Sequence, residues 1–133
     1  AIKNNTIDAI SSDHTSVEIE KKKCSFSKAN FGITGLETVF PICNSILKDE
    51  VPIEKIVELL SVNPRKILNI PYPSIEENKS ANITIFDPDE EWVYLEENIK
   101  SKSKNSPFIN QKFIGKVIGI LNKGRMALNR SSN

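Results

Sequence analysis

The chain has 133 residues, of which 38% are hydrophobic and 26% are charged, values typical of one ordinary folded domain. Its 18 Lys and Arg against 17 Asp and Glu give a formal charge of +1, too small to favour a phosphate backbone or an anionic membrane surface. No apolar run approaches the roughly 20 residues that span a bilayer. We therefore expect neither nucleic acid nor membrane as a partner.

The two cysteines and the single histidine limit the metal chemistry. Cys24 and Cys43 form no Cys-x-x-Cys pair, and one histidine cannot complete a metal set. Both thiols have apolar or aromatic neighbours, which fits reduced cysteines in the cytoplasm. The chain starts at Ala1 rather than Met, so we expect it to begin inside a larger protein.

The first predicted element is a short strand over residues 6–13, which ends in small polar residues and a carboxylate. Buried parallel strands have this pattern where they meet an active-site loop. The residues that follow are predicted to be helix or loop. If this strand pairs near its own position, its partner must lie N-terminal to Ala1.

Three helices are predicted next. Over residues 35–48, apolar side chains recur at spacings of three and four, with Thr34 as a possible N-cap. A second helix opens at Pro52, and a short third one starts at Asn63. The side chains that we expect these last two helices to bury are Ile53, Ile56, Val57, Leu60, Ile67 and Leu68.

Strands are predicted in the C-terminal part. Residues 82–86 and 92–95 are β-rich and are separated by the turn signal at 87–89, Asp-Pro-Asp. Residues 116–121 and 125–128 are expected to pair through a turn in which Gly124 takes positive φ. Helices followed by strands indicate the last unit of a β/α structure and part of a separate small sheet.

Asp13 is the first candidate for chemistry because β/α barrels carry catalytic groups at the carboxyl ends of their strands. The residue alone leaves other roles open, such as capping a loop or pairing with a lysine. The adjacent His14 cannot build a metal site by itself, and we expect it to have a structural hydrogen-bonding role.

Several segments, taken in order and with their spacing, resemble the C-terminal end of dihydroorotases, which are cyclic amidohydrolases. Allantoinases and hydantoinases share the Asp-His pair but match the Asp-Pro-Asp and Ser-Lys-Ser-Lys-Asn segments poorly. The resemblance spans essentially the whole chain. The segments that carry it are residues 8–14, 31–38, 63–68, 84–92, 101–108 and 115–117.

The resemblance implies an α/β fold, namely the C-terminal fragment of a (β/α)8 TIM-type amidohydrolase barrel plus the C-terminal part of the attached small β-sandwich. Residues 1–70 would hold the last strand and helices of the barrel, and residues 71–133 the C-terminal part of the β-sandwich domain with the closing loop. A TIM barrel needs roughly 250 residues. We therefore expect the missing N-terminal part of the same protein as a partner, or a homo-oligomer.

The resemblance also implies a zinc-dependent enzyme that interconverts N-carbamoyl-L-aspartate and L-dihydroorotate in de novo pyrimidine biosynthesis by hydrolysing a cyclic amide. Asp13 matches the aspartate that ends the eighth barrel strand, and would be both a metal ligand and the catalytic proton carrier. One or two zinc ions would be bound, with most ligands outside this chain. The fragment alone is therefore not expected to be active.

Substrate binding is only partly preserved. Phe31 and Gly32 match the family's substrate loop, where a residue without Cβ allows close approach to a flat ring. The family's substrate-binding histidine, four positions after the aspartate, is replaced by Val17, whose side chain offers no hydrogen bond. The alternative is a catalytically silent dihydroorotase-like subunit that binds and supports aspartate transcarbamoylase. A small α+β interaction domain unrelated to amidohydrolases is a third interpretation.

Overall fold

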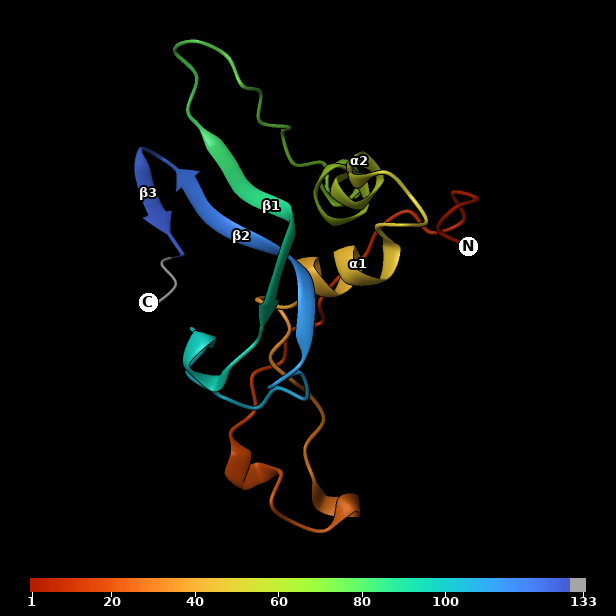
Figure 1. Cartoon of the computed structure of the whole chain (residues 1–133), viewed down its shortest axis with the longest axis vertical. Coiled ribbons are helices and arrows are strands. Elements are labelled where there is room, and N and C mark those ends of the chain that lie inside the picture. The colour runs from red at the N-terminus through yellow and green to blue at the C-terminus, as the bar shows by residue number, and fades with distance from the viewer. Residues whose placement is uncertain (130–133) are drawn as a thin grey trace.

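The structure is a computed structural model that describes residues 1–129. Figure 1 shows a long N-terminal stretch with little regular structure, a group of helices, and a three-stranded antiparallel sheet in the order β1-β2-β3. Residues 130–133 of the predicted second unit lie outside the described part. No helix of residues 1–129 is long and apolar enough to cross a membrane.

Residues 6–13, predicted as a short strand, pair with no other strand of residues 1–129, and the pairing expected with a segment N-terminal to Ala1 stays a prediction. The segment runs extended and uses isolated hydrogen bonds instead: the Ile10 amide donates to the Leu59 carbonyl at 2.9 Å, and Asn63 Nδ2 donates to the Asp8 carbonyl at 2.9 Å. A strand needs a neighbour with a free edge, and residues 1–129 offer none at this place.

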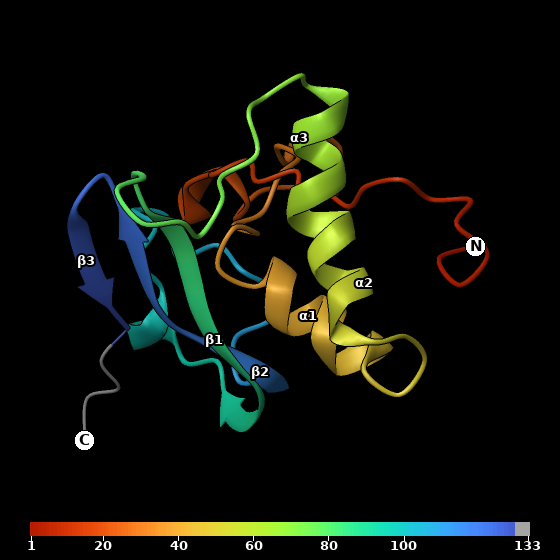
Figure 2. The same cartoon turned by 90° about the horizontal axis from the view of Figure 1, so that it is seen from above.

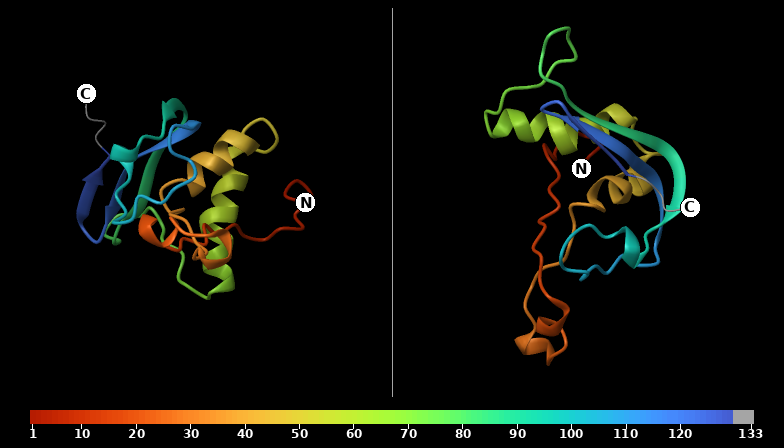
Figure 3. Two further views of the ribbon diagram at one scale, coloured as in Figure 1. Left: turned by 90° about the horizontal axis from the view of Figure 1, so that it is seen from below. Right: turned by 90° about the vertical axis from the view of Figure 1, so that its left-hand side faces the viewer.

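After this segment the chain makes a long excursion and returns. Figure 3 (right) shows the excursion projecting away from the rest of the molecule, with two short 3-10 helices near its end, η1 (Ile19–Lys21) and η2 (Phe26–Lys28). The outgoing and returning arms meet where the Thr15 amide donates to the Ile33 carbonyl at 3.1 Å.

The helices follow the predicted positions. The first is α1 (Val39–Leu47), and the second and third join into one rod made of α2 (Ile53–Val57), η3 (Glu58–Val62) and α3 (Asn63–Ile67), which Figure 2 shows beside α1. The η3 turn is a π-helix. Pro64 lacks the N–H that an α-helix would use at this point, and a wider turn accommodates that loss.

Two details of the helix prediction are wrong. Thr38, not Thr34, precedes the first turn of α1, and the Thr34 hydroxyl instead donates to the Asn105 carbonyl at 3.1 Å. Ile67 and Leu68 are 64% and 67% exposed rather than buried, because no described segment covers that face of α3. Ile56, which is 1% exposed, is buried as predicted.

The sheet consists of β1 (Asn82–Val93), β2 (Lys112–Asn122) and β3 (Arg125–Leu128). The predicted β2–β3 hairpin is confirmed: Asn122 pairs with Arg125, and Lys123 and Gly124 have φ values of 48° and 74°. The predicted turn at residues 87–89 is wrong, since β1 continues through it as a bulge. The Asp87 carboxylate accepts the amides of residues 89 and 90 at 2.8 and 3.2 Å, which absorbs the extra residues locally.

Side chains of α1 fill the gap that the bulge opens between β1 and β2. Asn44, which is 1% exposed, donates through Nδ2 to the carbonyls of Pro88 at 2.8 Å and Ile114 at 2.9 Å. The Ser45 hydroxyl accepts the Ile114 amide at 2.7 Å. Gly115 has a φ of 98°, and a Cβ there would lie 2.6 Å from Asn44 Nδ2, so this close contact requires glycine.

The core lies beside the sheet around Tyr94, Ile99 and Phe113, which are 1%, 3% and 4% exposed. Trp92 packs edge-on against Tyr94 with ring centroids 5.8 Å apart. Because α1 packs directly on β2, contacts cross the predicted boundary between residues 70 and 71. That boundary itself stays a prediction.

Candidate functional site

Asp13 stands in an exposed, left-handed backbone conformation with a φ of 44°. Asp tolerates this region better than most residues, and sparsely populated conformations are concentrated at functional sites. Two local bonds support the turn: the Asp13 amide donates to Ser11 Oγ at 3.4 Å, and the Thr15 hydroxyl donates to the Asp13 carbonyl at 3.4 Å. The carboxylate thus lies at the surface, as a group that meets a ligand must.

His14 ties this turn to the start of the α1 region. Its Nδ1 accepts the backbone amides of Gly35 at 3.1 Å and Leu36 at 3.3 Å. Nδ1 must be unprotonated to accept these bonds. The expected structural hydrogen-bonding role of His14 is therefore confirmed, and the nitrogen so used is not free to bind a metal.

The structure brings Gly32 against the residues that follow Asp13. Gly32 has a φ of 116°, and a Cβ there would lie 2.7 Å from the Thr15 carbonyl oxygen. Gly35 is equally close, because its Cβ would lie 2.8 Å from the Ser12 carbonyl oxygen. Packing against Thr15 therefore requires glycine at position 32 even without a bound ligand. Phe31, next to it, is 94% exposed.

A third segment, residues 99–105, holds the other side of this loop. Asn105 Nδ2 donates to the Gly32 carbonyl at 3.1 Å, and the Asn105 carbonyl accepts the Thr34 amide at 2.9 Å. The Ser103 hydroxyl donates to the Val17 carbonyl at 2.5 Å. Val17 itself is only 8% exposed, so its side chain is packed. Sequence reasoning singled out neither Ser103 nor Asn105, although both lie in a segment that resembles the family.

Glu37 anchors the start of this third segment. Its carboxylate accepts the Lys100 amide at 2.8 Å and the Ser101 amide at 2.8 Å. Bonds from amides to a charged acceptor are stronger than those to a neutral one. The Glu37 bonds therefore hold the N-terminal end of the segment of residues 99–105, which carries Ser103 and Asn105.

The described residues do not make a metal centre by themselves. Within residues 1–129, no three His, Cys, Asp or Glu side chains are grouped closely enough to hold a metal ion. Asp13 is suited to be one oxygen ligand because it is exposed at the end of its segment. A zinc site that includes it needs the remaining ligands from elsewhere.

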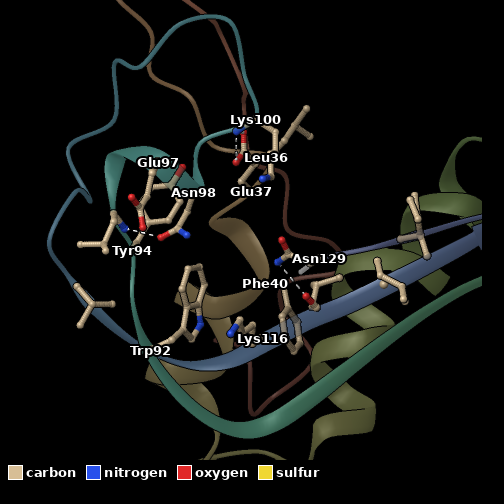
Figure 4. Close-up of a pocket in the computed structure, with 17 residues that line it drawn as sticks. Leu36, Glu37, Phe40, Trp92, Tyr94, Glu97, Asn98, Lys100, Lys116 and Asn129 are labelled. Atoms are coloured by element: carbon tan, nitrogen blue, oxygen red, sulfur yellow. Dashed lines mark hydrogen bonds between the residues drawn. The ribbon is translucent and has the colours of Figure 1, made fainter. Parts of the chain in front are cut away.

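A cavity of about 740 Å³ lies on the other side of Glu37, between α1 and the sheet. Figure 4 shows Trp92, Tyr94 and Lys116 along its wall, with Glu37 bonded to Lys100 at one end. Asp13, Phe31 and Gly32 are not part of this wall, so the cavity is separate from the candidate site. Burial, and then the nearby Glu37 charge, raise the pKa of Tyr94 to about 12.

Comparison with known proteins identifies the family. The chain is 36% identical over 129 residues to the dihydroorotase of Chlorobaculum tepidum, a match that covers 96% of the chain. It is 41% identical over 117 residues to the dihydroorotase of Elusimicrobium minutum, covering 86% of the chain. The chain belongs to the dihydroorotase family. No protein-family model matches the sequence.

Dihydroorotases are much longer than this chain, which spans 29% and 27% of the two relatives and corresponds to a C-terminal portion. Solved structures confirm the amidohydrolase fold class. The L-hydantoinase (dihydropyrimidinase) of Arthrobacter aurescens matches with a TM-score of 0.84 at 26% identity, over 98% of the chain and 31% of that protein. The D-hydantoinase of a Thermus species gives the same TM-score at 18% identity, over 99% of the chain and 31% of that protein, and supports the fold alone.

Proposed function

We propose that this chain is the part of a metal-dependent dihydroorotase that supplies the Asp13 carboxylate and the Phe31-Gly32 loop. One observation carries the proposal: Gly32 packs directly on Thr15. The motif that contains Gly32 therefore lies beside the motif that contains Asp13, although the two are separated in the sequence. The similarity to dihydroorotases over most of the chain supports the proposal. The whole protein would open L-dihydroorotate to N-carbamoyl-L-aspartate, and close it again, in the cytoplasm.

Hydrolysis of a cyclic amide needs a proton removed from water and a proton given to the departing nitrogen. An exposed carboxylate next to the substrate loop can do both, and such general acid–base catalysis contributes about 10²- to 10⁴-fold. Asp13 has this exposure. Zinc, when bound, would lower the pKa of its water towards neutrality. Asp13 would be one of its ligands.

Phe31 and Gly32 would contact the substrate ring. The Phe31 side chain is 94% exposed and can cover a flat ring, while the backbone of Gly32 offers polar groups without a side chain in the way. Val17 leaves the substrate carboxylate without the family's histidine. Loss of such a charge-assisted contact costs about 1.5–3 kcal/mol, on the order of ten to a hundredfold in affinity.

Val17 also favours a second candidate, a silent dihydroorotase-like subunit that supports aspartate transcarbamoylase. The two candidates are separated by assaying the full-length, zinc-loaded protein with L-dihydroorotate. Measurable ring opening supports the enzyme. If there is no turnover, and purified aspartate transcarbamoylase gains thermal stability when the full-length protein is added, the enzyme proposal fails and the silent subunit replaces it.

A further inference from the structure

We propose that His14 and Asn105 are positioning residues, which clamp the loop of residues 32–36 from two sides and fix Gly32 relative to Asp13. This inference rests on the proposed function, because it concerns the site at which that reaction would take place. Neither residue has to touch the substrate. Both act through the backbone of the loop.

His14 forms the side of the clamp next to the carboxylate. It follows Asp13 directly, and its Nδ1 accepts the amides of Gly35 and Leu36 at 3.1 and 3.3 Å. Asp13 lies in an exposed turn with a φ of 44° and has no sheet partner in the described chain. The Asp13 turn is attached to the loop by these two His14 bonds and by the Thr15 amide, which donates to the Ile33 carbonyl at 3.1 Å, and only the His14 bonds come from a side chain.

Asn105 holds the first residues of the loop, and His14 holds the last ones. Asn105 Nδ2 donates to the Gly32 carbonyl at 3.1 Å, and the Asn105 carbonyl accepts both the amide and the hydroxyl of Thr34, at 2.9 and 3.1 Å. Three hydrogen bonds thus join Asn105 to Gly32 and Thr34 of the loop. The side-chain bond reaches the residue that is expected to meet the substrate.

The segment that carries Asn105 is itself held in place. Glu37 accepts the Lys100 and Ser101 amides, and the Ser103 hydroxyl, 2.5 Å from the Val17 carbonyl, bonds back to the segment after Asp13. The three segments therefore form a closed set of contacts, with each joined to the other two. A loop held in this way is preorganised for binding, so a substrate does not have to order it.

Two substitutions of His14 distinguish the effect of its hydrogen-bond acceptor from the effect of side-chain size. In His14→Asn the side-chain oxygen lies close to the position of Nδ1 and can still accept the two amides. In His14→Gln the longer chain carries the amide group towards the position of Nε2, so the acceptor is lost.

For Asn105, Asn105→Asp keeps the size but replaces the donor by a carboxylate that cannot donate to Gly32. Lys102→Ala, an exposed change in the same segment, is the control.

The experiment uses the full-length protein and two readouts. Amide hydrogen exchange at Gly35 and Leu36 is expected to accelerate about tenfold or more in His14→Gln and to stay near the wild-type rate in His14→Asn. With L-dihydroorotate, His14→Gln and Asn105→Asp are expected to raise KM by about tenfold, with zinc content unchanged and kcat within about threefold. Lys102→Ala should change neither.

The clamp is overturned if His14→Asn and His14→Gln behave alike in exchange, or if Asn105→Asp leaves KM unchanged in an active protein. Thermal melting of each variant shows whether it folds. If the full-length protein has no turnover, the proposed function fails separately, and exchange alone decides: protection lost in His14→Gln and kept in His14→Asn supports the clamp, and equal exchange refutes it.

Discussion

Asn44→Leu removes the donor that bridges the bulge of β1 to β2. Leu has the same branching and the same number of side-chain heavy atoms as Asn, so the change deletes hydrogen bonds and opens no cavity. The carbonyls of Pro88 and Ile114 then lose a donor at 2.8 and 2.9 Å. Ile114 keeps a contact with the Ser45 hydroxyl at 3.3 Å, so its loss is partial. At about 1–3 kcal/mol for each buried group left unpaired, we expect a total loss of about 2–3 kcal/mol.

Urea unfolding of the protein measures this loss. Asn82→Leu, the same change at an exposed position of β1, is the matched control and should stay within about 0.5 kcal/mol of wild type. The reasoning is refuted if Asn44→Leu is no less stable than Asn82→Leu. In that case the bulge does not depend on the side chain of α1.

Two further predictions concern Tyr94 and Val17. The tyrosinate absorbance that Tyr94→Phe removes from the protein is expected to titrate at about 12. Since this pKa is raised above the ordinary value of about 10, the stabilisation is complete below about pH 10 and is lost as the pH rises through 12; titration near pH 10 in the folded protein would contradict this. Val17→His is expected to lower the KM for L-dihydroorotate by about tenfold to a hundredfold, through a restored contact to the substrate carboxylate. A less stable protein with an unchanged KM would show that position 17 does not face the substrate, as its present 8% exposure makes possible.

The elements with local signals could be predicted from the sequence. Pro52 marks the start of the second helix, and Gly124 marks the hairpin turn, because each residue restricts or permits backbone angles at its own position. The strand predicted at residues 6–13 stays untested, since a strand depends on a partner and no strand of residues 1–129 pairs with this segment. The apolar faces of Ile67 and Leu68 are exposed for the same reason.

The bulge in β1 was missed because its cause is distant. Asp87-Pro88-Asp89 is a turn signal in isolation, yet Asn44 on α1 stabilises a continuous strand through the Pro88 carbonyl. The residue that stabilises the bulge is remote in sequence, so the local pattern around residues 87–89 could not predict it.

The candidate site likewise combines residues that the sequence identified with contacts that only the structure showed. Asp13, Phe31 and Gly32 were identified by family resemblance, and the roles given to them stay predictions. The His14 bonds were foreseen as a structural role. The contact between Asn105 and the Gly32 carbonyl joins residues 73 positions apart and became visible only in three dimensions.

The most direct test of the central claim compares wild-type full-length protein with Asp13→Asn in the ring opening of L-dihydroorotate, at equal protein concentration and saturating zinc. Asp8→Asn, an exposed carboxylate in the same segment, serves as the control. Removal of an acid–base group is expected to lower kcat by at least about a hundredfold, and Asp8→Asn should keep the wild-type rate. Equal rates for wild type and Asp13→Asn would contradict the role assigned to this carboxylate.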